Sequence, residues 1–135
     1  MARLLARRCG GVGAGRHDRS ASIAEEPEPK ALARLLATGE MTSAALLALA
    51  LDRAGVPHEV FDAAQVDLRT AGERLEAQPV SIDLTPIERA HARGAVVVLP
   101  GFIGRDAEGA PTLLGRGGSD LTALFLAQRW QARCV

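Results

Sequence analysis

Residues 115–120, Gly-Arg-Gly-Gly-Ser-Asp, hold the side chains best suited to binding a small anion. Their glycines let backbone N–H groups approach an anion closely, and the helix predicted to follow adds about half a positive charge. Arg116 could hold a carboxylate or phosphate through two parallel hydrogen bonds, and Ser119 could add a hydroxyl. The segment is equally typical of a tight turn before a capped helix with a solvated arginine. It is not a Walker A loop, because no Gly-Lys-Ser/Thr follows.

Glu40 is a second candidate for ligand binding, because it stands just before an almost entirely apolar stretch over residues 44–51. A glutamate in the first turn of a helix commonly does no more than interact with the helix dipole. A buried carboxylate that faces an arginine is better explained as a partner for a ligand amine. Both interpretations of Glu40 stay open on the local sequence.

The composition narrows the classes of function. The 135 residues suffice for one domain, and 47% of them are hydrophobic, enough for a packed core. Sixteen basic residues balance sixteen acidic ones, which gives no electrostatic reason to expect a nucleic acid partner. No apolar run approaches the roughly 18 residues that cross a membrane, and a cytoplasmic protein is expected. No metal site is predicted, because the usual ligands lack partners at metal-binding spacing: Cys9, Cys134, His17, His58 and His91.

Helices and strands alternate along the chain in the predicted structure. The helices cover residues 30–37, 40–54, 86–93 and 121–132, and the strands cover residues 56–61 and 95–99. We expect Thr38 to cap the second helix and Thr85 to cap the third, in a capping box with Glu88. Ser119 or Asp120 is expected to cap the last helix.

Burial and irregular segments also follow from the pattern. Residues 44–51 are apolar nearly all round, which predicts a helix buried on several sides. Residues 95–99 are β-branched and continuous, which predicts a strand buried on both faces. Residues 62–80 are expected to be irregular. Residues 104–111 are expected to form a polar loop with Gly109 in its turn, and residues 133–135 to begin another strand.

This order of elements predicts an α/β fold with a mainly parallel sheet. In such sheets ligands bind at the carboxyl ends of strands and at helix N-termini, where Gly101 and residues 116–120 fall. The glycine-rich residues 10–15 and the acidic, proline-broken residues 25–29 precede the folded part. We therefore expect a disordered, degenerate segment over residues 1–24 and one domain over residues 25–135.

Two motifs resemble those of the aspartokinases, a group within the amino acid kinase family. Residues 101–104 (Gly-Phe-Ile-Gly) and 112–123 (Thr-Leu-Leu-Gly-Arg-Gly-Gly-Ser-Asp-Leu-Thr-Ala) resemble that family's GFIG turn, its TTLGRGGSD segment and the helix after it. Upstream, residues 38–46 resemble its Gly-Glu pair before a Ser-Ala-rich helix. The resemblance covers residues 30–135, and residues 126–135 are similar to the forms linked to homoserine dehydrogenase.

The resemblance implies a partial three-layer α/β/α domain of an aspartate kinase. Such enzymes move the γ-phosphate of MgATP to the side-chain carboxylate of L-aspartate, the entry step to lysine, threonine and methionine. By resemblance, Arg116 binds a carboxylate of aspartate, Glu40 binds its amino group, and Asp120 helps to organise the catalytic lysine. The remaining residues implied for the site form its active-site loop and its glycine–serine corner: Gly101, Phe102, Gly117, Gly118 and Ser119.

The chain departs from the family pattern at both ends. The family's first strand ends in Lys-Phe-Gly-Gly, whereas residues 8–11 read Arg-Cys-Gly-Gly, which puts Arg8 in the place of the catalytic lysine. A planar guanidinium is a poor substitute for an ammonium in a tight phosphate site. The family also continues beyond the position of Val135 into its nucleotide half, so most of the ATP site is expected to be absent. We therefore expect a partial aspartate kinase, acting with a complementary kinase chain or as a homo-oligomer. The alternative is a non-catalytic remnant or a subunit that binds a small anion or amino acid.

Overall fold

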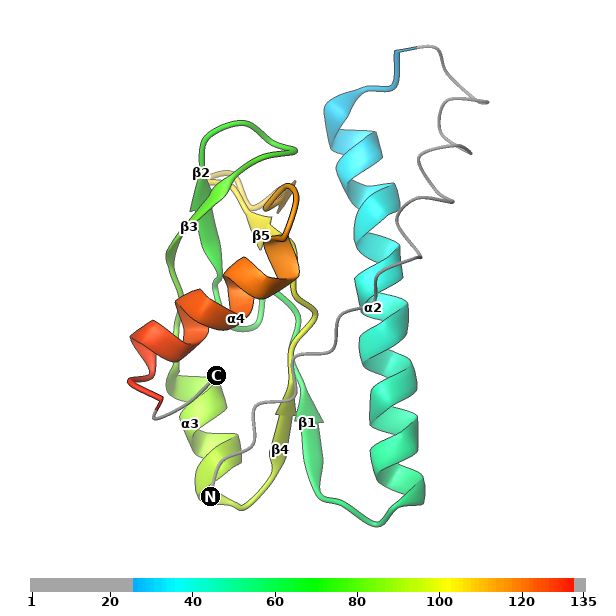
Figure 1. Cartoon of the computed structure of the whole chain (residues 1–135), viewed down its shortest axis with the longest axis vertical. Coiled ribbons are helices and arrows are strands. Elements are labelled where there is room, and N and C mark those ends of the chain that lie inside the picture. The colour runs from blue at the N-terminus through cyan, green and yellow to red at the C-terminus, as the bar shows by residue number, and fades with distance from the viewer. Residues whose placement is uncertain (1–25, 133–135) are drawn as a thin grey trace.

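Helix α2 (Pro29–Arg53) is the longest element of the computed structural model, which describes residues 26–132 (Figure 1). The Glu28 carboxylate caps its N-terminus, accepting hydrogen bonds from the backbone N–H groups of Lys30 and Ala31 at 2.9 and 2.8 Å. Pro29 suits the first helical position because its missing N–H would have no partner inside the helix. The helix therefore starts where its own sequence satisfies its free N–H groups.

The predicted break at Thr38 and Gly39 is wrong, because α2 continues through both residues. The Thr38 hydroxyl caps no second helix and instead donates to the carbonyl oxygen of Leu35 at 2.7 Å. Gly39 is buried within the helix, where a glycine costs about 1 kcal/mol relative to alanine. Burial of Leu36 and Ala44 on either side of it compensates for that cost, since tertiary packing dominates helix stability.

Two parallel strands, β1 (His58–Val60) and β4 (Val96–Val98), form the smaller sheet. Both were predicted, and their parallel pairing is confirmed. The prediction that the second strand is buried on both faces is wrong for most of it, because only Val98 is fully buried. Helix α2 lies on one side of this sheet and α3 (Thr85–Ala92) lies on the other (Figure 1). The arrangement is a partial α/β/α sandwich.

A second, mixed sheet has the order β3-β2-β5-β6. Its strands are β2 (Arg69–Ala71), β3 (Gln78–Ser81), β5 (Ile103–Arg105) and β6 (Pro111–Leu113). Strands β2 and β5 are parallel, and the two outer pairs are antiparallel. The prediction of irregular structure over residues 62–80 is therefore wrong for β2 and β3, and the loop predicted over residues 104–111 is confined to residues 106–110, between β5 and β6. In this loop Gly109 has φ +81°, as its predicted turn position requires.

The caps of the last two helices differ from the predicted ones. The N-cap of α3 is Leu84 and not Thr85, and the side chain that bonds near this end is Asp83, which accepts from the Thr85 N–H at 2.9 Å. No capping box forms, because the Glu88 N–H donates to the Leu84 carbonyl oxygen. Helix α4 (Gly118–Arg129) starts three residues earlier than expected, with Gly117 as its N-cap. Neither Ser119 nor Asp120 caps it.

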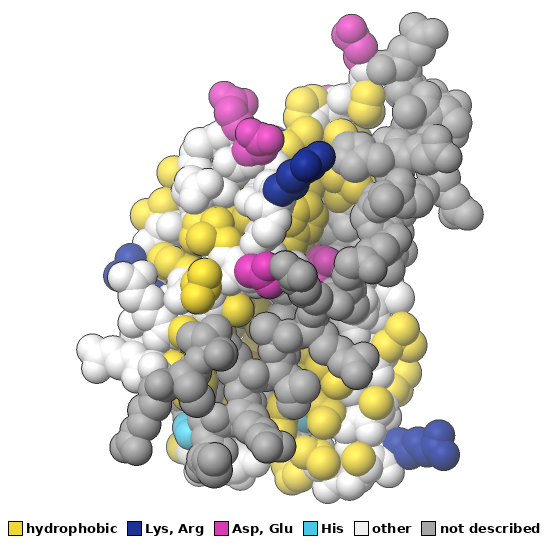
Figure 2. Space-filling model, in the orientation of Figure 1, with side chains coloured by type: hydrophobic (Ala, Val, Ile, Leu, Met, Phe, Trp, Pro, Cys, Tyr) yellow, Lys and Arg dark blue, Asp and Glu magenta, His cyan; other side chains and the backbone are white. Residues whose placement is uncertain are grey.

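The second half of α2 is exposed within the described part of the chain. Leu46 and Leu49 are 62% and 64% exposed, and Figure 2 shows hydrophobic side chains over this part of the surface. The prediction of burial on several sides is therefore wrong, because β1, β4 and β6 pack against one face of the helix only. By length and composition alone α2 could cross a membrane, although no such helix was predicted. A core helix of a soluble protein meets the same criterion, so this is weak evidence.

The core lies where the helices meet both sheets. Its buried members come from α2, the segment before β2, α3, β5, β6 and α4, and include Leu36, Leu68, Ile87, Leu113 and Leu126. The predicted α/β class is thus confirmed, with one parallel sheet and one mixed sheet. The predictions for residues 1–24, which include Arg8, Cys9 and His17, and for residues 133–135, which include Cys134, lie outside the described residues.

Candidate functional site

The turn after β4 lies directly against the start of α4. A β-carbon added to Gly101 would lie 2.9 Å from the Cα atom of Ser119 and 3.1 Å from its Cβ atom. Real Cβ atoms essentially never come within 3.0 Å of another residue, so only glycine fits this approach. The structure therefore brings together two predicted parts of the site that are 18 positions apart in sequence.

Phe102 fastens this turn to the segment that carries Arg116. Its backbone is in the left-handed region, with φ +71°, which is unusual for a bulky residue. Its carbonyl oxygen accepts from the Leu114 N–H at 2.9 Å, and its N–H donates to the Thr122 hydroxyl at 3.0 Å. Left-handed backbone in a non-glycine residue persists only where its surroundings hold it, and it concentrates at functional sites.

The glycines of the corner have separate structural reasons. Gly115 and Gly117 have φ +68° and +71°, which glycine adopts without strain. A β-carbon on Gly118 would lie 2.7 Å from the Phe102 ring and 2.9 Å from the Leu114 side chain. These glycines let the chain turn sharply into α4, with Arg116 exposed and Ser119 half-buried. The residues of the predicted corner thus lie in one tight turn at the start of α4.

Glu40 lies on α2, which packs against β6, the strand that leads into this corner. Burial raises the pKa of the half-buried Glu40 carboxyl above its usual 4.5. Within residues 26–132 it makes no ion pair with Arg116. The structure thus gives Glu40 a partly desolvated carboxylate whose charge a bound cation would stabilise.

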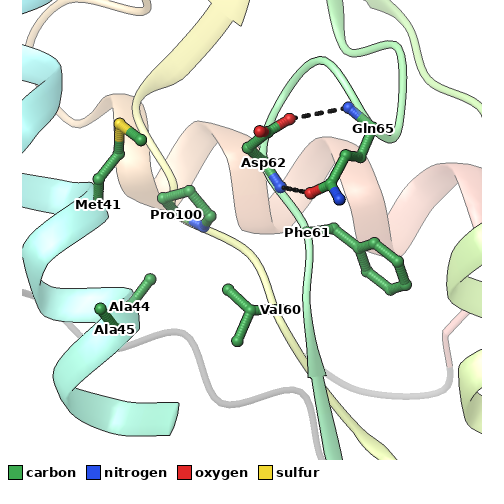
Figure 3. A pocket seen from close by; sticks show the side chains of 8 residues that line it. All are labelled: Met41, Ala44, Ala45, Val60, Phe61, Asp62, Gln65 and Pro100. Carbon is green, nitrogen blue, oxygen red and sulfur yellow. Dashed lines mark hydrogen bonds between the residues drawn. The ribbon is translucent and has the colours of Figure 1, made fainter.

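A cleft lies between α2 and the turn after β4, and its lining includes neither Glu40 nor Arg116. It has a volume of about 210 Å³ and is lined by α2, the end of β1 and the turn after β4: Met41, Ala44, Ala45, Val60, Phe61, Asp62, Gln65 and Pro100. Figure 3 shows the α2 side chains on one side, opposite Val60 and Pro100. Met41 follows Glu40 and Pro100 precedes Gly101, so the cleft lies between the two segments.

The far wall of the cleft is held by a local turn. The Asp62 N–H donates to Oε1 of Gln65, and Oδ1 of Asp62 accepts from the Gln65 N–H, each at 2.8 Å (Figure 3). These reciprocal bonds fix the chain where β1 ends. Because the carboxyl ends of parallel strands are the usual ligand edge of an α/β sheet, the cleft lies where ligands are expected.

The remaining candidate residues have different positions and different contacts in the structure. Asp120 lies in the first turn of α4, within the corner but exposed. His91 packs edge-on against the Trp130 ring with 5.2 Å between centroids, so its role here is packing. Residues 26–132 contain no group of three or more His, Cys, Asp or Glu side chains that could hold a metal ion. Thr122 was not predicted as part of the site, although its hydroxyl accepts from Phe102 in the turn after β4.

Known proteins with similar sequences are aspartate kinases. The chain is 41% identical over 115 residues to an aspartate kinase of Stutzerimonas stutzeri, a match that covers 85% of this chain and 28% of that protein. It is 41% identical over 110 residues to an aspartokinase of Pseudomonas aeruginosa, covering 82% of this chain and 27% of that protein. The chain therefore corresponds to little more than a quarter of the length of these relatives.

Solved structures and a family model agree with these relatives. Escherichia coli aspartokinase III in complex with aspartate and ADP superposes with a TM-score of 0.71 at 28% identity, covering 93% of this chain and 30% of that one. Aspartate kinase from Synechocystis gives a TM-score of 0.68 at 35% identity, covering 91% and 20%. The model of the amino acid kinase family matches residues 1–135. The chain thus belongs to the amino acid kinase family and is similar to the aspartokinases within it.

Proposed function

We propose that this chain carries the aspartate-binding part of an aspartate kinase. The observation that supports this most directly is the contact of the Gly101 turn with Ser119 at the N-terminus of α4. This contact brings the start of α4, with Ser119 and the nearby Arg116, to the carboxyl end of β4, which supports a carboxylate site there. Aspartate and ADP are the ligands of the E. coli aspartokinase III complex.

Each end of the substrate has a proposed partner. Arg116 binds one carboxylate of aspartate through paired hydrogen bonds, and Glu40 binds the ammonium group. The raised pKa of Glu40 supports this role, because a bound ammonium offsets the desolvation of the carboxylate. The Gly117 N–H and the Ser119 hydroxyl complete the carboxylate site, and the Gly101–Phe102 turn forms its wall. The Gly118 N–H instead donates to the Gly115 carbonyl oxygen at 3.1 Å and so holds the shape of the corner.

The activity of the whole enzyme is the transfer of a phosphoryl group from MgATP to the side-chain carboxylate of aspartate, at the start of lysine and threonine synthesis. Catalysis would rest on positioning and charge neutralisation, without a covalent intermediate. Asp120 would orient the cationic group that meets the phosphates, in the place where the sequence offers Arg8. We propose a cytoplasmic protein that acts as a homo-oligomer or with a complementary kinase chain.

Isothermal titration of the full chain with L-aspartate tests the binding site. We expect measurable binding that Arg116→Ala and Glu40→Ala abolish, because charged hydrogen bonds contribute about 1.5–3 kcal/mol each. Arg129→Ala is the matched control: this exposed arginine at the other end of α4 donates to the Val80 carbonyl oxygen, away from the corner. Binding that ignores Arg116→Ala and Glu40→Ala would refute the assignment.

Succinate separates the two proposed contacts, because it keeps both carboxylates of aspartate and lacks the amine. The unmodified chain should prefer aspartate to succinate by about tenfold or more, and Glu40→Gln should remove that preference. A coupled assay with MgATP then distinguishes a kinase from the alternative. Aspartate binding without phosphorylation would favour a subunit that only binds the amino acid.

A further inference from the structure

Thr122 connects the two segments of the corner through one hydroxyl. This residue is 4% exposed and lies in the second turn of α4. Its hydroxyl accepts from the Phe102 N–H at 3.0 Å and donates to the Gly118 carbonyl oxygen at 2.8 Å. Both the accepting and the donating capacity of this hydroxyl are therefore in use, one toward the turn after β4 and one toward the first residue of α4.

Two hydrogen bonds join the backbone of Phe102 to residues that precede and follow Arg116 in the sequence. Its carbonyl oxygen accepts from Leu114, and its N–H donates to Thr122. Its left-handed φ of +71° costs about 1–2 kcal/mol in a residue with a β-carbon, so these bonds must hold it there. Without the Thr122 hydroxyl, the partly buried Phe102 N–H would lose its partner and the strained turn one of its two restraints.

We propose that Thr122 is a positioning residue of the aspartate site, which holds the Gly101–Phe102 turn against the start of α4 so that Arg116 and the corner N–H groups face the substrate together. This role rests on the proposed function. Thr122 touches no substrate itself, and it acts through the backbone of Phe102 and Gly118. A helix threonine that bonds only to the carbonyl four residues back would have no such role, and it is the second bond, across to Phe102, that distinguishes it.

Three variants of the full chain test this inference. Thr122→Val keeps the shape of the side chain and loses the hydroxyl, whereas Thr122→Ser keeps the hydroxyl. Thr112→Val is the matched control, because Thr112 is 2% exposed and its hydroxyl bonds to the Thr70 hydroxyl at 2.7 Å, outside the corner. All three are measured for aspartate affinity by calorimetry, for stability by thermal unfolding, and for hydrogen exchange at the Phe102 amide.

We expect Thr122→Val to weaken aspartate binding about fivefold to tenfold and to speed exchange at Phe102, because a net hydrogen bond and the position of the turn are lost. Thr122→Ser should bind within about twofold of the unmodified chain. Thr112→Val should lower stability to a similar extent as Thr122→Val but leave aspartate affinity and Phe102 exchange unchanged.

Several outcomes would overturn the proposal, and they differ from failure of the proposed function. If the unmodified chain binds aspartate and Arg116→Ala abolishes binding, but Thr122→Val binds normally, the positioning role is refuted and the site stands. Equal weakening in Thr112→Val and Thr122→Val would show a general loss of stability and would also refute it. If the unmodified chain binds no aspartate, the proposed function fails and this role fails with it.

Discussion

Replacing Gly101 with alanine should push the two segments of the corner apart. The new β-carbon would lie 2.9 Å from the Cα atom of Ser119 and 3.1 Å from its Cβ atom. Carbon atoms pack best at about 3.5–4.0 Å, so the turn and the helix start must separate by roughly half an ångström or more. Backbone atoms of Ser119 cannot rotate away as the end of a side chain would.

The expected loss of stability is about 1–3 kcal/mol, the usual range for an extra carbon in a closely packed contact. Aspartate affinity should fall at least about tenfold, because a small displacement misaligns hydrogen-bond donors that act together. Thermal unfolding gives the first quantity, and calorimetry with L-aspartate gives the second.

Gly94→Ala is the control, because it should lower stability without moving the turn after β4 or the start of α4. Gly94 ends α3 with φ +78°, and a β-carbon there would meet no atom within 4 Å. Its cost is the left-handed backbone penalty, about 1–2 kcal/mol, which is similar to that expected for Gly101→Ala. If Gly101→Ala is destabilised as expected but binds aspartate like Gly94→Ala, the turn after β4 is not part of the site.

Three further predictions concern charge and surface. Burial raises the pKa of Glu40, so stability is lost as the pH rises above the ordinary value of 4.5, and the loss is complete once the pH passes the raised pKa. Glu40→Gln should raise the unfolding midpoint at pH 7 and reduce its pH dependence, and an unchanged midpoint would contradict this. The pKa of Asp106 lies below its usual 3.8. Burial alone would raise this pKa, but hydrogen bonds from the Ala110 N–H and the Arg74 guanidinium lower it by more. The stabilisation from the Asp106–Arg74 pair is present above pH 3.8 and is lost as the pH falls through the lowered pKa. Arg74→Ala should therefore lower the unfolding midpoint more at pH 7 than at pH 3. Leu46→Lys and Leu49→Lys should change the midpoint little and reduce self-association in light scattering, whereas equal self-association would exclude this apolar surface as its cause.

Local patterns predicted the elements whose periodicity is strong. Strands β1 and β4 and helices α3 and α4 lie within a few residues of their predicted positions. Strands β2 and β3 were missed because their short segments carry no alternating pattern, and β2 joins the sheet through pairing with the distant strand β5 while β3 pairs only with β2. Pro79 stands in β3, which is an edge strand, where a missing backbone N–H is tolerated.

The break that was wrongly predicted in α2 shows that a glycine in the sequence is not enough to predict the end of a helix. Thr38 and Gly39 look like the end of one helix and the start of another, because threonine is a common cap and glycine a common breaker. Burial of the helix on either side decides the outcome, and burial depends on β1, β4 and β6, which lie later in the chain. For the same reason, the sequence could indicate Gly101 and Ser119 as site residues but could not show that they touch.

The N-termini of α2 and α4 differ in a way that bears on ligand binding. At α2, both carboxylate oxygens of Glu28 accept from backbone N–H groups, so the chain supplies its own anion. At α4 the N-cap is Gly117, which has no side chain, and the acidic residue of the first turn is Asp120. A helix end with positive partial charge and no side chain at its N-cap leaves room for a carboxylate from a ligand, and Arg116 adjoins that end. Glycine at position 117 thus serves a chemical as well as a conformational purpose. The side chain of a capping Asp or Ser at this position would occupy the place proposed for the aspartate carboxylate.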